Sequence, residues 1–165
     1  MKKLICAMLA AALVLAACGA ALAENITVDS FSFVTGDLDG NSLTSAELFA
    51  GNRITMINFW ATWCGPCVRE LGDLAKVHSQ LRELGCGVVG ILVDDDFTEA
   101  RNLMKENGTN YPMLTLSEDM NPLLAGITVV PTTIFVDSNG AIVGETIEGA
   151  FPERYVDAVK ALLTK

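Results

Sequence analysis

The sequence predicts an α/β fold in which strands alternate with helices. An apolar run at 54–59, rich in β-branched residues, has the pattern of a buried strand. Apolar residues then recur at helical spacing from Val68 to Leu84, which indicates a helix. A second apolar run at 86–93 precedes another helical segment at 97–107. Successive strand–helix units are typical of a sheet covered by helices.

The chain begins with a pattern typical of an export signal. Two lysines precede an apolar run from Leu4 to about Ala17, which is too short to span a bilayer comfortably. Residues 15–18 match a bacterial lipobox, in which Cys18 is lipidated, whereas the residues up to Ala23 fit an ordinary signal-peptidase site. We expect a signal sequence at 1–23. Cleavage precedes Cys18 in a lipoprotein, which we favour, and otherwise follows Ala23. Either route exports the protein to a compartment where disulfides persist.

The remaining segment, 24–165, is long enough for one domain and too short for two. The chain has 11 basic and 20 acidic residues and a formal net charge of −9. The signal sequence contains two lysines and no acid, so the mature domain is more acidic still. This charge argues against binding nucleic acid and against electrostatic attachment to anionic lipids.

Residues 26–49 predict a hairpin and a short helix ahead of the first central strand. Apolar and polar residues alternate around Phe31, Phe33 and Leu43, and a turn signal at 37–41 lies among them. Residues 42–48 then have the pattern of a short helix with a Ser or Thr cap.

The segment 60–67, Trp-Ala-Thr-Trp-Cys-Gly-Pro-Cys, lies where the strand at 54–59 leads into a helix. Pro66 is tolerated in a first helical turn, because its missing N–H would have no partner there. The unpaired N–H groups and the helix dipole favour negative charge, so a thiol at Cys64 loses its proton more readily. Cys67 shares a helix face with Cys64 and can form a disulfide with it. The pattern is that of a redox site.

A Cys-x-x-Cys pair is also half of a zinc site, which needs about four nitrogen or sulfur ligands. The other candidate ligands in the mature chain, Cys86 and His78, do not form a second closely spaced pair. We therefore favour redox chemistry and expect no metal; a non-enzymatic module that handles a metal or haem is the alternative. Cys86 opens the strand at 86–93, where buried cysteines usually act as small hydrophobic residues, with a third redox thiol as the alternative. His78 is expected to be an exposed helix residue, with a catalytic base as the alternative.

The later part of the chain predicts further strands and helices. Asp94–Asp96 lack the spacing of a calcium loop, so we interpret them as a solvated strand end and the first acids of the helix at 97–107. A strand is expected near 113–116, and Pro131 is permitted at the head of a β-branched strand that runs to Asp137. Residues 138–140 predict the turn of a final hairpin, and a closing helix starts at 151–154. Its apolar positions are Tyr155, Val156, Val159, Leu162 and Leu163.

The string at 58–67 resembles the active site of the thioredoxin superfamily, and more narrowly that of the TlpA/ResA-like extracytoplasmic thiol–disulfide oxidoreductases. The resemblance covers residues 27–163 in order. It implies a thioredoxin-like three-layer sandwich, with a mixed central sheet, an N-terminal hairpin and a central βα insertion. It also implies that the Val130–Pro131 bond is cis and lies against the cysteines, with the Val130 backbone free to pair with an extended substrate segment. The implied substrate contacts are Trp63, Gly65, Pro66, Val130 and Pro131.

Two positions near the cysteines bear on the mechanism that the resemblance implies. Asn58 stands where thioredoxin places a buried acid, and an amide cannot take a proton from Cys67. Glu70, one helical turn beyond Cys67, occupies the position of an active-site Glu in the TlpA/ResA-like branch. The resemblance therefore makes Glu70 a candidate acid/base group; a surface helix residue is the alternative.

The resemblance implies dithiol–disulfide exchange, in which Cys64 attacks a substrate disulfide and Cys67 resolves the mixed disulfide. The Gly-Pro dipeptide between the cysteines resembles that of reductants, so we expect a protein disulfide reductase. An oxidase or isomerase of the same fold is the alternative. We expect no cofactor and a monomer.

The implied partners are a disulfide-containing extracytoplasmic protein, for example in cytochrome c maturation or reductase recycling, and a membrane thiol transporter of the CcdA or DsbD type as electron donor. The expected location is the outer face of the cytoplasmic membrane, with a lipid anchor. A soluble periplasmic or secreted protein is the alternative.

Overall fold

A computed structural model of the chain describes residues 32–164. In chain order its elements are β1 (Val34–Gly36), β2 (Ser42–Thr44), α2 (Ser45–Ala50), β3 (Ile54–Trp60), α3 (Gly65–Glu83), β4 (Gly87–Leu92), α4 (Phe97–Glu106), β5 (Met113–Leu114), the 3₁₀ helix η1 (Glu118–Met120), α5 (Asn121–Leu124), β6 (Thr132–Asp137), β7 (Ile147–Glu148) and α6 (Pro152–Leu163). The predicted signal sequence at 1–23 and the lipidation site Cys18 lie outside the described residues.

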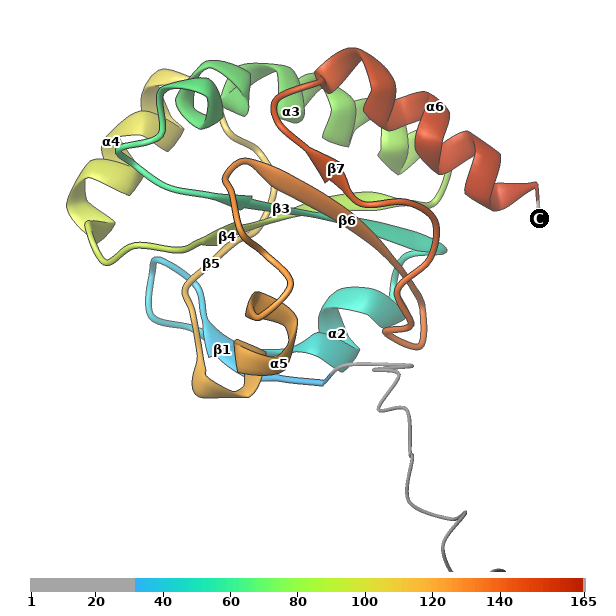
Figure 1. Ribbon diagram of the computed structural model, residues 1–165, viewed down its shortest axis with the longest axis horizontal. Coiled ribbons are helices and arrows are strands. Elements are labelled where there is room, and N and C mark those ends of the chain that lie inside the picture. The colour runs from blue at the N-terminus through green and yellow to red at the C-terminus, as the bar shows by residue number, and fades with distance from the viewer. Residues whose placement is uncertain (1–31, 165) are drawn as a thin grey trace, which may run out of the picture.

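A five-stranded mixed sheet with the order β5-β4-β3-β6-β7 forms the centre of the domain. The strand β4 runs parallel to β3 and β5, whereas β6 is antiparallel to β3 and β7. Helices α3, α4 and α6 cover one face of the sheet, and α2, α5 and β1 lie on the other (Figure 1). The predicted three-layer α/β sandwich with a mixed sheet is confirmed.

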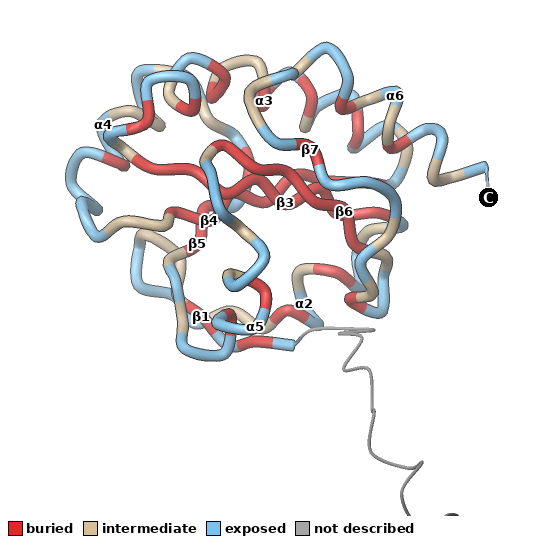
Figure 2. Tube along the Cα trace, in the orientation of Figure 1, coloured by how far each residue is buried: buried red, intermediate tan, exposed pale blue. Residues whose placement is uncertain are grey.

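The central strand β3 is buried along its whole length (Figure 2). Successive side chains of a strand point to opposite faces of the sheet. Met56 and Trp60 accordingly pack in the apolar cluster beneath α3 and α6, whereas Ile57 and Phe59 pack in the cluster on the α2 side. The same alternation directs Asn58 toward α3.

The N-terminal hairpin is present, but its second strand takes residues that were predicted as helix. Residues 42–44 pair antiparallel with β1, and α2 begins only at Ser45. Thr44 caps this helix: its hydroxyl accepts from the Glu47 N–H at 3.2 Å, and the Glu47 carboxylate accepts from the Thr44 N–H at 2.9 Å. This capping box sets the start of the helix and leaves 42–44 extended.

The predicted strand near 113–116 is shorter in the structure, where β5 ends at Leu114, and the short helices η1 and α5 follow it without having been predicted. The turn at 138–140 is confirmed: Gly140 has a φ of 83°, which favours glycine, and its N–H donates to the Asp137 carbonyl at 3.1 Å. The closing helix α6 is also confirmed. Within the described part of the chain, no helix combines the length and apolar character needed to cross a membrane.

Candidate active site

Cys64 and Cys67 form a disulfide at the N-terminus of α3, with their Cα atoms 5.2 Å apart. Cys64 is the N-cap residue of the helix, and its sulfur lies 3.3 Å from the backbone nitrogen of Cys67. Pro66 lies in the first turn, as the sequence predicts. Cys64 retains 5% exposure whereas Cys67 is fully buried, so Cys64 is the more accessible of the pair.

The loop that leads into Cys64 is held by a carboxylate at the end of the neighbouring strand. The Thr62 N–H and hydroxyl both donate to Asp94 Oδ2, at 2.6 and 3.0 Å. Asp96 instead caps α4 by accepting from the Glu99 N–H at 3.0 Å. Asp94 therefore has a structural role that the sequence interpretation missed. The signal was available, because β3 and β4 are parallel and their carboxyl ends meet at one edge of the sheet.

The segment before β6 lies against the disulfide. The Val130–Pro131 peptide bond is cis, as the resemblance implied. The Val130 carbonyl oxygen lies 3.5 Å from Cys64 Sγ, and the Pro131 carbonyl accepts from the Gly149 N–H at 2.7 Å. The fold thus brings together two predicted site segments that lie 66 residues apart in the chain.

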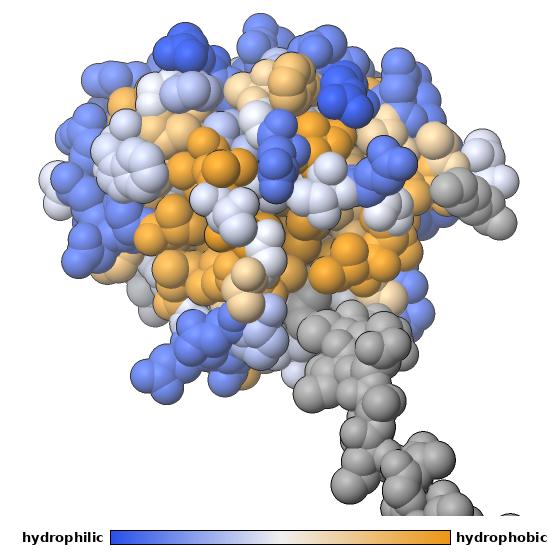
Figure 3. Space-filling model, in the orientation of Figure 1, coloured by the Kyte–Doolittle hydropathy of each residue, from blue (hydrophilic) through white to orange (hydrophobic). Residues whose placement is uncertain are grey.

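An apolar groove lies next to the disulfide region, since Trp63 precedes Cys64 and the Val130 carbonyl lies beside it. Its volume is about 290 Å³, and it is lined by Trp63, Val93, Leu116, Leu124, Ile127, Thr128, Val129 and Val130. Trp63 is 72% exposed, and Leu116 and Val129 are also exposed. Orange side chains gather across the middle of the face that Figure 3 shows, with blue ones around its upper edge. The sequence interpretation found Trp63 and Val130 but missed the wall that the segment 116–129 supplies.

Glu70 is only 2% exposed, so the alternative of a surface helix residue is wrong. Its Oε1 accepts from Asn58 Nδ2 at 3.0 Å, and its Oε2 accepts from the Tyr155 hydroxyl at 3.0 Å. Asn58 Nδ2 also donates to Thr133 Oγ1 at 3.1 Å. The sequence interpretation missed Thr133 and Tyr155 as partners of this carboxyl group.

Burial raises the pKa of Glu70 to about 7, because the charged form loses its hydration. The hydrogen bonds from Asn58 and Tyr155 act in the opposite direction, and the nearby charge of Asp73 raises the pKa further. A carboxyl group with a pKa near 7 can give up and accept a proton at neutral pH. Glu70 thus has the protonation behaviour that an acid/base group needs.

Two other titratable residues, His78 and Cys86, are partly or fully buried and have structural roles. His78 is half-buried and not exposed as expected, because its Nδ1 accepts from the Val88 N–H at 3.0 Å. Burial lowers its pKa. Cys86 is a free thiol that is fully buried, and burial raises its pKa. This confirms the structural interpretation of Cys86, since a buried thiol with a raised pKa is a poor nucleophile.

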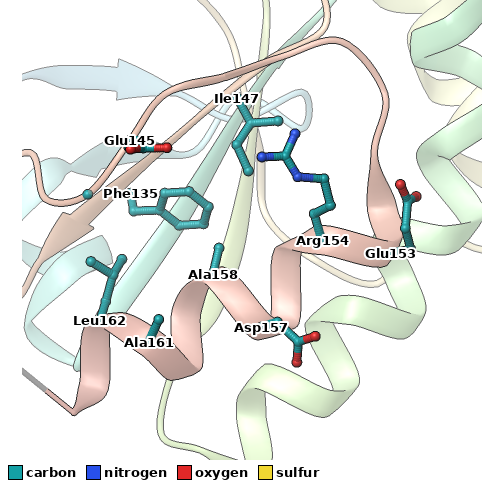
Figure 4. A pocket seen from close by; sticks show the side chains of 10 residues that line it. Phe135, Glu145, Ile147, Glu153, Arg154, Asp157, Ala158, Ala161 and Leu162 are labelled. Carbon is teal, nitrogen blue, oxygen red and sulfur yellow. The ribbon is translucent and has the colours of Figure 1, made fainter.

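A second cavity, of about 410 Å³, lies between α6 and the β6–β7 region (Figure 4). Phe135 and Ile147 face Ala158 and Leu162 across it, and Arg154 lies at one end. None of the predicted site residues lines this cavity. The Cys64–Cys67 disulfide lies elsewhere, at the start of α3.

Comparison with known proteins agrees with this geometry. Residues 23–163 match the Redoxin family. The chain is 28% identical over 133 residues to the thiol-disulfide oxidoreductase ResA of Halalkalibacterium halodurans, a match that covers 80% of this chain and 73% of that protein. It is 28% identical over 129 residues to the ResA of Bacillus subtilis, covering 78% of this chain and 70% of that protein.

Among solved structures, the chain is similar to a thiol:disulfide interchange protein of the thioredoxin family from Chlorobium tepidum TLS. The two share 30% sequence identity and superpose with a TM-score of 0.69. The match covers 82% of this chain and 95% of that one.

Proposed function

Since the chain belongs to the Redoxin family and is a ResA-like thiol–disulfide oxidoreductase, we propose that it reduces disulfides in extracytoplasmic proteins through Cys64 and Cys67. The observation that carries the proposal is the disulfide at the N-terminus of α3, with Cys64 partly accessible beside the Val130 carbonyl and Cys67 buried behind it.

The reaction begins with the reduced pair. The Cys64 thiolate attacks one sulfur of a substrate disulfide, which forms a mixed disulfide and releases the first substrate thiolate. Cys67 then loses its proton and attacks Cys64 Sγ, which releases the second substrate thiolate and forms the Cys64–Cys67 disulfide. Two electrons pass from the protein to the substrate.

Glu70 is the proposed acceptor of the Cys67 proton. Residues three apart lie on one face of a helix, and both groups are buried. Asn58, which stands close to Glu70, has no titratable group. The raised pKa of Glu70, about 7, suits a group that takes up a proton as Cys67 attacks and releases it to solvent afterwards.

The proposed substrate surface consists of residues around the disulfide, of which Val130 is half-buried and Pro131 is buried. Trp63, Gly65 and Pro66 are exposed on one side of it, and Val130 with Pro131 lies on the other. An extended substrate segment would pair with the backbone at Val130 by strand addition. The apolar groove would receive a hydrophobic side chain that flanks the substrate cysteine.

The reducing direction rests on the Gly65–Pro66 dipeptide, which resembles that of reductants. Such a protein needs electrons from across the membrane, and we propose a thiol transporter of the CcdA or DsbD type as the donor. Export, with a lipid anchor at Cys18 or as a soluble form, places the domain where such substrates occur. Cytochrome c maturation and reductase recycling are the processes proposed for it, and the domain is proposed to act as a monomer without a cofactor.

The test is an equilibrium titration of the Cys64–Cys67 pair against glutathione buffers. A reductant is expected near the thioredoxin value of about −270 mV. A potential above about −180 mV, in the isomerase range, would overturn the reducing direction in favour of an oxidase or isomerase.

A further inference from the structure

Four buried polar side chains form a hydrogen-bonded polar cluster in the layer between the sheet and the helices α3 and α6. They are Asn58 on β3, Glu70 on α3, Thr133 on β6 and Tyr155 on α6, and none is more than 2% exposed. Asn58 donates to Glu70 and Thr133, and Tyr155 donates to Glu70.

The hydrogen-bond donors of this polar cluster determine which carboxyl oxygen of Glu70, Oε1 or Oε2, carries a proton. The Asn58 amide donates to Oε1, and the carbonyl oxygen of a carboxylic acid accepts hydrogen bonds better than its hydroxyl oxygen. A proton on the carboxyl group therefore belongs on Oε2, which faces the Tyr155 hydroxyl at 3.0 Å. A hydroxyl has a single proton, and two donors cannot point at each other. When the proton on Oε2 points to the Tyr155 hydroxyl, Tyr155 must therefore direct its own proton elsewhere.

A second acceptor for the Tyr155 proton lies within reach. The hydroxyl oxygen is 3.3 Å from the Gly149 carbonyl oxygen, and it also accepts from the Phe151 N–H at 3.4 Å. The Gly149 N–H donates to the Pro131 carbonyl at 2.7 Å. The hydroxyl can therefore turn between Glu70 and the loop that is hydrogen-bonded to Pro131.

We propose that Tyr155 is a positioning residue for the exchange reaction. Its hydroxyl donates to the Glu70 carboxylate and turns to the Gly149 carbonyl when the carboxyl group is protonated. Glu70 can then gain and lose a proton in place, with no buried donor left facing another donor. This inference rests on the acid/base role proposed for Glu70.

The groups that face Glu70 are few. Among the described residues, Asn58 and Tyr155 donate hydrogen bonds to it, and Asp73 on the same helix opposes its ionisation by charge. Tyr111 lies close enough for the Glu70 charge to act on it, and the thiol of Cys67 precedes Glu70 by one helical turn. Tyr155 thus supplies one of two donors that favour the carboxylate.

The experiment uses Tyr155→Phe, which removes the hydroxyl and keeps the ring. In the oxidised protein, where the cysteines do not titrate, the Glu70 carboxyl carbon is followed by NMR across pH 4–9. Its midpoint is expected to rise by about one pH unit, the effect of losing one charge-assisted hydrogen bond. In single-turnover reduction of a model disulfide, the pH profile of the resolving step is expected to shift upward by the same amount, a loss of up to about tenfold in rate below the midpoint.

Tyr111→Phe is the matched control, since it makes the same change at another buried tyrosine that donates no hydrogen bond to Glu70. Unchanged midpoints in Tyr155→Phe, or equal shifts in both variants, would overturn the inference. Glu70→Gln separates this outcome from failure of the proposed function. If Glu70→Gln keeps the wild-type pH profile of exchange, Glu70 is not the acid/base group. The titration midpoint of the Glu70 carboxyl group in Tyr155→Phe still shows whether the Tyr155 hydroxyl stabilises the carboxylate.

Discussion

The two faces of β3 differ in what they bury. Toward α2, Ile57 and Phe59 pack in a cluster of apolar side chains that also includes Phe49 and Ile134. Toward α3 and α6, Asn58 joins a carboxyl group and two hydroxyl groups in hydrogen bonds. Burying an ionisable group without a cation is unfavourable, so apolar side chains in this space would give a more stable fold. The apolar face therefore contributes mainly to stability, whereas the polar face contains the group that we propose acts in the chemistry of the cysteines.

The largest effect is expected at the cysteines themselves. Cys64→Ser should abolish disulfide exchange, because the attacking thiolate is lost. Cys67→Ser should instead accumulate mixed disulfides with substrates, since the resolving thiol is missing. Non-reducing gel electrophoresis after mixing with a disulfide-bonded protein measures both outcomes.

The control for this pair is Cys86→Ser, at a buried thiol outside the disulfide. Its exchange rate should match that of the wild-type protein once any loss of stability is accounted for. Turnover that survives in Cys67→Ser and disappears in Cys86→Ser would contradict the assigned pairing.

A substitution on the apolar face should act on stability alone. Phe59 is fully buried, and Phe59→Ala should lower the free energy of unfolding by about 3–5 kcal/mol through lost burial and the cavity that remains. Urea unfolding measures the loss. The pH profile of exchange, measured on the folded fraction, should not move. A shifted profile would show that the two faces are coupled.

A substitution on the polar face should change how stability depends on pH. The pKa of Glu70 is 4.5 in the unfolded chain and about 7 in the fold. Between these values the unfolded state releases the proton first, so stability falls as pH rises from about 4.5 to about 7. The shift corresponds to about 3 kcal/mol. Glu70→Gln should remove this fall, as urea unfolding at several pH values will measure.

The same variant should affect the two cysteines in opposite ways. A carboxylate near the pair raises both thiol pKa values by like-charge repulsion, so Glu70→Gln should make Cys64 more acidic. Resolution of the mixed disulfide should nevertheless slow, because the proposed proton acceptor is gone. Alkylation of Cys64 against pH and single-turnover reduction separate the two effects. No change in either would assign Glu70 a structural role only.

The sequence was sufficient to predict the elements next to the cysteines but not the polar cluster around Glu70. The strand β3 and the helix α3 carry strong periodic patterns, and Cys64 and Cys67 lie at their junction. The contact between Glu70 and Tyr155 joins residues 85 positions apart. From the sequence alone, Tyr155 is predicted only to occupy an apolar position of the closing helix. Local patterns contain no signal for such a tertiary contact.

The exposed wall of the groove was missed for a related reason. Leu116 and Val129 are exposed, yet in a single sequence they look like any core residue. The start of α2 was misplaced because Ser42 and Thr44 both suit an N-cap, and only the reciprocal bonds with Glu47 select Thr44.

The smallest effect on stability is expected at Trp63, which lies outside both faces of β3. Because its side chain is 72% exposed, Trp63→Ala should change the free energy of unfolding by no more than about 0.5 kcal/mol. Loss of an aromatic contact with substrate should cost about 1–2 kcal/mol, which corresponds to roughly a five- to thirtyfold lower kcat/KM for a protein disulfide. A small disulfide reagent that does not reach the groove should react with Cys64 at the wild-type rate. An equal loss with both reagents would show that Trp63 acts on the cysteine pair itself and not on the substrate surface.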